Sequence, residues 1–246
     1  MSSIRRSLTI FALALAPMLT VGCASAPPPV PVYAPQFSFP YPAGEAPASD
    51  VTIAIVRPVD SAGLTNTDNL SAKNAVAFNT AMTAQFQEMF SKKGFKQTGP
   101  FDDLNSMTFV DKKTADLTLT PQVGITITAP HVDIHHQDDM FGTRPGKIYQ
   151  ATGPCVVSGF VSFVLLEPLS GEKIWVKKVD VPQTEADCSG ERPDSRGLNT
   201  IITNGAAHAL EQVYAAVMKK AWDYLSPEEV TLLKKQSQEL RAKKVY

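Results

Sequence analysis

The feature that most constrains the fold is a β-hairpin predicted between residues 155 and 181, CVVSGFVSFVLLEPLSGEKIWVKKVDV. Two runs rich in β-branched and aromatic residues flank a short segment, in which Pro168 and Gly171 supply the residue types that turns require. Lys177 and Lys178 are expected to face water. The segment therefore commits this part of the chain to an antiparallel sheet.

Further strands are predicted on either side of this hairpin in the sequence. Residues 115–129, ADLTLTPQVGITITA, alternate apolar residues with mostly threonines, which indicates a half-buried antiparallel strand with a bend, bulge or edge at Pro121 and Gly124. Residues 51–56, VTIAIV, are nearly all apolar, which indicates a strand buried on both faces. The remaining expectations are a strand at 94–99, a short helix or turn at 102–113, and a polar loop at 182–198.

Three helices are predicted from apolar residues at spacings of three and four. The first covers about 70–93 and ends at a glycine cap, and the second covers about 201–224. The third begins at SPEE, where Ser226 is the expected N-cap and Glu229 its capping-box partner, and it ends in a basic RAKK tail expected to be solvated. The apolar positions are Phe78, Met82, Phe86 and Met89, then Leu210, Val213, Val217 and Ala221, then Val230, Leu233 and Leu240.

Together these elements predict an α+β fold, in which a mainly antiparallel sheet packs against long helices and the C-terminus is helical. Residues 50–246 are enough for a single domain with its own core. The prolines before it favour extended structure, so residues 23–49 are predicted to be a linker that spaces the domain from a membrane. A docking motif is the alternative role for the aromatic residues of this linker.

The first 22 residues are predicted to be a lipoprotein signal peptide. Arg5 and Arg6 precede an apolar stretch at 8–19, and Gly22 lies directly before Cys23. Cleavage before Cys23 would leave its thiol to carry a diacylglycerol, which anchors a protein without a membrane-spanning helix. Ala24, where an inner-membrane lipoprotein has aspartate, favours the outer membrane. The alternative is an ordinary signal peptide cut nearby, with the cysteine incidental.

The charge and the motifs exclude several classes of function. The chain has 23 basic and 24 acidic residues, and loss of the signal peptide removes two arginines and no acid, so the net charge goes from −1 to −3. This balance argues against a nucleic-acid partner. The sequence has no Gly-x-Ser-x-Gly elbow, phosphate loop or His-Glu-x-x-His motif, so we predict no enzymatic activity and no cofactor.

The other two cysteines, Cys155 and Cys188, are a candidate disulfide. An oxidising location outside the cytoplasm favours a bridge between them, and two unpaired thiols are the alternative.

The stretch HVDIHHQDD, residues 131–139, offers candidate metal ligands. His131, Asp133, His135 and His136 carry donor groups suited to Zn²⁺, Cu²⁺ or Ni²⁺. In a helix, residues 131 and 135 would share a face, and in a strand residues 131, 133 and 135 would do so. The sequence does not decide between these two geometries, and the stretch contains no cysteine that could act as a further metal ligand. We therefore assign the stretch to a polar loop and keep a metal site as the alternative.

Four segments follow Cys23 in this order: VTIAIVRPVD, FNTAMTAQFQEMFSKKGFKQTGPFDD, GFVSFVLLEPLSGEKIW and ALEQVYAAVMKKAWDYLSPEEVTLLKKQSQELRAKK. Together they resemble the neuraminyllactose-binding hemagglutinin family of lipoproteins, the HpaA-like adhesins. The resemblance covers residues 50–130 and 157–244 and is strongest in the hairpin at 159–172. It implies an outer-membrane or surface lipoprotein, an adhesin or flagellar-sheath component, and binding of sialylated glycans.

The chain departs from this family where the glycan-binding run is proposed to lie. In the family, Lys-Arg-Thr-Ile-Gln-Lys follows a strand that ends in proline. Here the matching strand is GITITAP, residues 124–130, and the stretch HVDIHHQDD that follows it has no lysine or arginine. Cationic donors recognise a sialic acid carboxylate best, and three aspartates repel it at neutral pH, although protonated histidines would soften the repulsion in acid. Sialoside binding is therefore doubtful for this chain.

The leading hypothesis is a non-enzymatic, lipid-anchored outer-membrane or surface lipoprotein, adhesin-like or associated with a flagellar sheath. Its partners would be the membrane and either a host glycan or protein or another envelope component. Two alternatives stay open: a periplasm-facing structural or assembly lipoprotein without an external ligand, and a metal-binding envelope lipoprotein.

Overall fold

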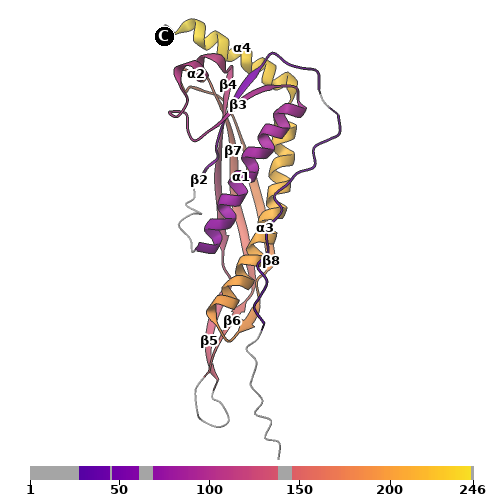
Figure 1. Cartoon of the computed structure of the whole chain (residues 1–246), viewed down its shortest axis with the longest axis vertical. Coiled ribbons are helices and arrows are strands. Elements are labelled where there is room, and N and C mark those ends of the chain that lie inside the picture. The colour runs from indigo at the N-terminus through magenta and orange to yellow at the C-terminus, as the bar shows by residue number, and fades with distance from the viewer. Residues whose placement is uncertain (1–27, 45, 61–68, 138–145, 245–246) are drawn as a thin grey trace, which may run out of the picture.

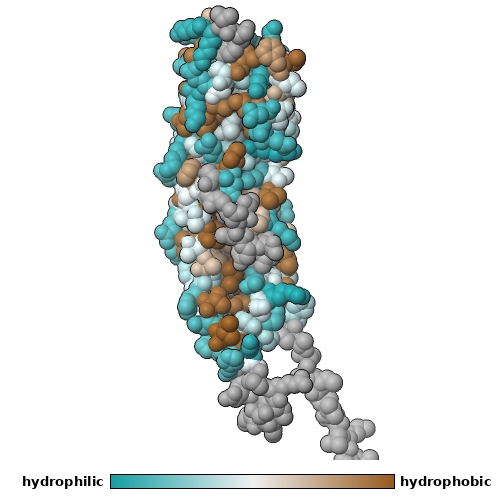
Figure 2. All heavy atoms as spheres, turned by 90° about the vertical axis from the view of Figure 1, so that its left-hand side faces the viewer, coloured by the Kyte–Doolittle hydropathy of each residue, from teal (hydrophilic) through white to brown (hydrophobic). Residues whose placement is uncertain are grey.

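A mixed β-sheet and two long helices on one of its faces form the body of the molecule, which is elongated along the strand direction (Figure 1, Figure 2). The computed structural model describes residues 28–44, 46–60, 69–137 and 146–244. The predicted α+β class and the helical C-terminus are confirmed. Within these ranges, no helix is long and apolar enough to cross a membrane.

The large sheet combines a parallel and an antiparallel half. Its strands lie in the order β3 (Lys96–Phe101), β1 (Thr52–Val56), β4 (Leu117–Thr128), β7 (Pro154–Leu166) and β8 (Lys173–Asp187), and the short β2 (Val59–Asp60) also pairs with β4. β1 is parallel to β3 and β4, because a helix returns the chain from one end of the sheet to the other. The strands β4, β7 and β8 pair antiparallel, as the hairpin predicts.

A second sheet extends the antiparallel half. It consists of β5 (His131–Gln137), β6 (Gly146–Thr152) and β9 (Gly190–Arg192), in the order β5–β6–β9. Each of its strands continues a strand of the large sheet after a break of one or two residues, at 129–130, at Gly153 and at 188–189. The backbone N–H of Gly153 donates to Ser189 Oγ at 3.3 Å, which ties two of the breaks together.

Two loop predictions are wrong here. Residues 131–137 form β5, and most of the expected loop at 182–198 belongs to β8, β9 and the start of a helix. Residues 182–187 show no apolar alternation, and in 131–137 only Val132 and Ile134 alternate with polar residues, which is too short a pattern to reveal a strand. Their backbone groups nevertheless pair with β6 and β7, and this ladder supplies the hydrogen bonds that water would otherwise supply.

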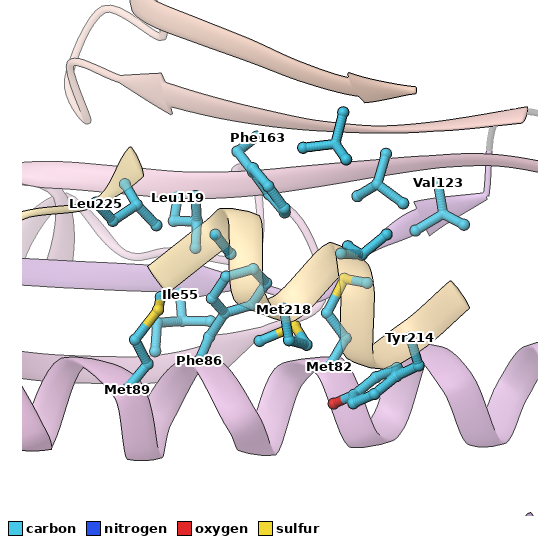
Figure 3. Packing of buried hydrophobic residues seen from close by; sticks show 14 of the residues in the cluster. Ile55, Met82, Phe86, Met89, Leu119, Val123, Phe163, Tyr214, Met218 and Leu225 are labelled. Carbon is cyan, nitrogen blue, oxygen red and sulfur yellow. The ribbon is translucent and has the colours of Figure 1, made fainter. Parts of the chain in front are cut away.

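The helices α1 (Asn69–Lys92) and α3 (Ser195–Tyr224) lie side by side on one face of the large sheet. Figure 3 shows Met82, Phe86 and Met89 of α1 and Tyr214 and Met218 of α3 directed into the space below the sheet. All five are buried and belong to one core cluster with residues of β1, β4 and β7. The prediction that the methionines and phenylalanines of the first helix are core is therefore confirmed.

Two further helices lie at the end of the molecule opposite β5. The helix α2 (Phe109–Thr114) begins with a capping box between Thr108 and Asp111, and α4 (Pro227–Lys243) begins at the predicted N-cap Ser226. The carboxylate of Glu229 is not the expected capping partner, because it accepts a hydrogen bond from the Trp175 indole at 2.8 Å. This contact fixes α4 to β8.

The tail of α4 is not simply solvated, because Arg241 joins three elements. Its Nε donates to Glu167 Oε1 at 2.6 Å, and its Nη2 donates to the carbonyl oxygens of Lys112 and Ala115 at the C-terminal end of α2. Glu167 lies in the β7–β8 turn and also accepts hydrogen bonds from the backbone N–H groups of Leu169 and Ser170. One buried carboxylate therefore holds the turn, α2 and α4 together.

β4 and β7 pair in unbroken register through Gly124, and the irregularity lies in the neighbouring β7–β8 pairing, between Val157 and Gly159. Gly159 of β7 is paired with Ile125 and has φ +133°, and a Cβ there would lie 2.0 Å from the Gly124 carbonyl oxygen. A Cβ at Gly124 would in turn lie 2.5 Å from the ring of Phe160. Pro121 lies where the partner of β4 changes from β1 to β2. The close approach of β7 therefore requires a glycine at position 124, and the change of partner strand allows a proline at position 121.

We expect Gly159→Ala to lower the free energy of unfolding by about 3 kcal/mol or more, because its Cβ would collide with backbone and its φ is unfavourable for alanine. The matched control is Gly153→Ala, whose φ is +103° but whose Cβ would meet no atom within 4 Å. This control is expected to cost about 1–2 kcal/mol. Urea unfolding measures both, and equal costs would contradict the backbone collision.

Glu167→Gln is expected to destabilise the protein by about 2–4 kcal/mol at pH 7. Burial opposes ionisation of Glu167, but the hydrogen bonds from Arg241 and the turn outweigh it and lower its pKa from 4.5 to about 2. Because the folded-state pKa is the lower one, the stabilisation is full above pH 4.5 and is lost as the pH falls from 4.5 to about 2.

Urea unfolding at several pH values measures this effect, and the difference between the wild type and the variant should shrink across that acidic range. The control is Glu172→Gln, which removes an exposed ion pair with Lys244. That change should cost less than about 1 kcal/mol. A pH-independent cost of Glu167→Gln would refute the electrostatic explanation.

Candidate functional site

Most of the candidate site residues lie at one end of the molecule. We call this the hairpin end and define it by β5, β6, β9 and the first two turns of α3 (Figure 1). It contains the described part of the HVDIHHQDD stretch, and the disulfide lies at its border with the large sheet. Cys23 and the aspartates at 138 and 139 lie outside the described residues.

The histidines of β5 are divided between the two faces of the strand. His131, Asp133 and His135 alternate along one face, and His136 points to the other. His131 Nε2 lies 3.1 Å from Asp133 Oδ1, whereas His135 Nε2 lies 3.1 Å from Gln150 Oε1 of β6. In the described part of the chain, no group of three or more histidine, cysteine, aspartate or glutamate side chains is placed to hold a metal ion.

The face of β5 that carries His136 also carries two exposed apolar side chains. Val132 is 44% exposed and Ile134 is 55% exposed. Among the described strands β5 pairs only with β6, so its other edge has no strand beside it. Lys147 is the register partner of His136. This face therefore offers apolar contact with few cationic donors, which suits a weakly polar partner better than a carboxylate.

The cysteines that the sequence identifies as a candidate pair are joined in the structure. Cys155 and Cys188 form a disulfide with their Cα atoms 5.5 Å apart, fully buried where β7 and β8 meet the hairpin end. A Cβ at Gly205 of α3 would lie 2.3 Å from Cys188 Sγ. The sequence analysis missed Gly205, although the run GAAHA around it has the small side chains that a closely packed helix needs.

Residues 31–49, which we call the strap, do not form a free spacer. The side chain of Asn204 in α3 binds the strap at both of its polar groups: Oδ1 accepts from Tyr33 N at 2.8 Å and Nδ2 donates to Pro31 O at 2.9 Å. The Tyr33 ring packs on His208 with centroids 3.8 Å apart, and its hydroxyl donates to Glu211. Because the Glu211 carboxylate accepts a hydrogen bond from this phenol, the pKa of Tyr33 is raised above its ordinary value.

The aromatic residues of the strap bind the protein's own helices. Phe37 contacts Phe78 and Tyr214 at centroid distances of 5.5 and 5.4 Å, and Tyr41 packs on Trp222 at 5.0 Å. These contacts advance along α1 and α3 in the same direction as the strap, as the trace beside α3 in Figure 1 shows. Tyr33, Phe37 and Phe39 are partly buried and Tyr41 is buried, so the described residues of the strap pack against the domain in place of the expected spacer.

The strap and α1 also line an open groove of about 1020 Å³. The described lining residues are mostly small and apolar, and Lys73 is the charged one among them. A neighbouring hollow of about 470 Å³ shares Val76, Thr80 and Ala84 with it. Among the described lining residues of both hollows, small and apolar side chains predominate at the shared positions, so these surfaces offer mainly apolar contact.

The sequence matches the family model described as neuraminyllactose-binding hemagglutinin precursor over residues 32–244. The matched range begins inside the strap, which agrees with the packing of the strap on the domain. No curated protein matches the chain.

The fold is similar to solved structures. A neuraminyllactose-binding hemagglutinin homolog from Helicobacter pylori superposes with a TM-score of 0.61 at 16% identity, over 84% of this chain and 100% of that chain. Protein XCC0632 from Xanthomonas campestris matches with a TM-score of 0.38 at 13% identity, over 85% and 99% of the two chains. The H. pylori structure shares the fold, and at this identity nothing beyond the fold is shown.

Tyr41→Ala is expected to lower the free energy of unfolding by about 2–4 kcal/mol, because it removes a buried ring from the Trp222 contact. It also removes the hydrogen bond to the Gln85 carbonyl oxygen. Val32→Ala is the control: this side chain is 75% exposed and should change stability by less than about 0.5 kcal/mol. Thermal unfolding measures the stability, and rapid proteolysis of the wild-type strap would contradict its docking.

Proposed function

Because the chain belongs to the neuraminyllactose-binding hemagglutinin family, we propose that it is a non-enzymatic, lipid-anchored interaction protein of the bacterial outer membrane. The observation that carries the proposal is the signal-type segment that ends in Gly22 and Cys23, directly upstream of the family domain. A diacylglycerol on that cysteine would hold the protein at a membrane from its N-terminal side.

The partner we propose is a host glycan or protein, or another envelope component such as a flagellar-sheath protein. The composition of β5 makes a sialylated glycan the less favoured ligand, because residues 131–137 contain no lysine or arginine and include Asp133. The mostly apolar lining of the groove between the strap and α1 favours contacts with protein. The alternative is a periplasm-facing structural lipoprotein without an external ligand.

Replacement of the anchor residue tests the first part of this proposal. We expect Cys23→Ser to move the protein from the membrane fraction to the soluble fraction and to abolish the acylated N-terminal peptide in mass spectrometry. Ser25→Ala, two residues away, should retain both properties. A wild-type protein that carries no acyl group on Cys23 would refute the proposal.

Surface labelling tests the second part. Antibody binding to intact cells, compared with permeabilised cells, is expected to show that the domain is accessible from outside. A domain that is labelled only after permeabilisation would refute the adhesin-like role and would leave the periplasm-facing alternative.

A further inference from the structure

We infer that the hairpin end of this protein faces the phospholipid bilayer that holds its anchor, and that Val132 and Ile134 of β5 insert into the bilayer interface. The inference rests on the proposed lipidation of Cys23. It assigns a membrane-contact role to the stretch that, in sequence, takes the place of a glycan-binding run.

The first observation is where the chain enters the described structure. Residues 28–32 line a hollow of about 350 Å³ with Arg192 of β9 and the first residues of α3. Asn204 binds Pro31 and Tyr33 just beyond this point. The dark trace of the strap in Figure 1 accordingly begins at the hairpin end. The chain therefore leaves the domain beside β9 and not beside α4.

The second observation is the shortness of the remaining chain. Five residue steps separate Cys23 from Pro28, and a fully extended chain covers at most about 18 Å in that number of steps. In contrast, α3 has 30 residues and spans about 45 Å from the hairpin end toward α4. The strap cannot lengthen this tether, because its aromatic residues are docked on α1 and α3. The hairpin end therefore stays close to the bilayer.

The third observation is the chemistry of the surface held there. Val32, Val132 and Ile134 expose 75%, 44% and 55% of their surface at this end. Hydrophobic atoms are also visible near the lower end of the molecule in Figure 2. Two or three aliphatic side chains bind a bilayer weakly, but an attached lipid gives them a high effective concentration at the interface. Contact therefore depends on the anchor.

The same geometry places the α2–α4 end farthest from the membrane. Phe109 and Val110 of α2 are 62% and 69% exposed there, beyond the reach of the tether. A label at this end is therefore the matched control for a label on β5.

The experiment uses the lipidated full chain in phosphatidylethanolamine and phosphatidylglycerol vesicles, with and without a nitroxide-labelled lipid. An environment-sensitive fluorophore is attached to Ile134→Cys or to Val110→Cys, while the Cys155–Cys188 disulfide stays oxidised. Both native side chains are exposed, so either label is compatible with folding. We expect the nitroxide lipid to quench the label at 134 and to leave the label at 110 unchanged.

Each other outcome overturns the inference. Quenching at 110, alone or together with 134, would mean that the molecule is inverted or lies flat. No quenching at either position would mean that the hairpin end does not reach the bilayer. A label at 134 that is blue-shifted but unquenched, in a protein that cross-links as a dimer, would mean that a second copy covers β5.

Flotation with the vesicles and the mass of the N-terminal peptide are measured on the same samples. A chain that is not acylated would refute the proposed lipid anchor. A chain that is acylated and floats, but whose label at 134 is not quenched, would refute only the inferred orientation.

Discussion

The structure depends on the burial of one apolar face of the large sheet beneath α1 and α3. The two helices present Phe86, Met89 and Tyr214 among many buried side chains to the strands β1, β4 and β7. The strap lies along both helices and packs Phe37 against Phe78 of α1 and Tyr41 against Trp222 of α3. The packing of the two helices on the sheet therefore determines where the N-terminal segment lies.

This arrangement links the fold to the function. A strap docked parallel to α3 carries the chain from the hairpin end to the first strand, so the end where a lipid would be attached is decided by packing. Arg241 and Glu167 close the opposite end by joining α4, α2 and the β7–β8 turn. The two ends thus differ: the described chain begins beside one of them, and side-chain hydrogen bonds join three elements at the other.

Sequence reasoning succeeded where one physical signal dominated. The hairpin at 155–181 and the long helices have strong periodicity, and the cysteine pair needed only an oxidising location. It failed at 131–137 and 182–187, because most of these residues are polar and the strands are revealed only by their pairing with β6 and β7. It also failed for the strap, because prolines predict extended backbone but do not say whether that backbone is packed.

The sequence by itself determined the α+β class, the antiparallel hairpin and the helices, because these follow from local periodicity and turn chemistry. The tertiary structure alone decided which histidines share a face, which glycine lets α3 approach the disulfide, and where residue 28 lies. These properties arise from contacts between segments far apart in the chain, and no local pattern encodes the distance between such segments.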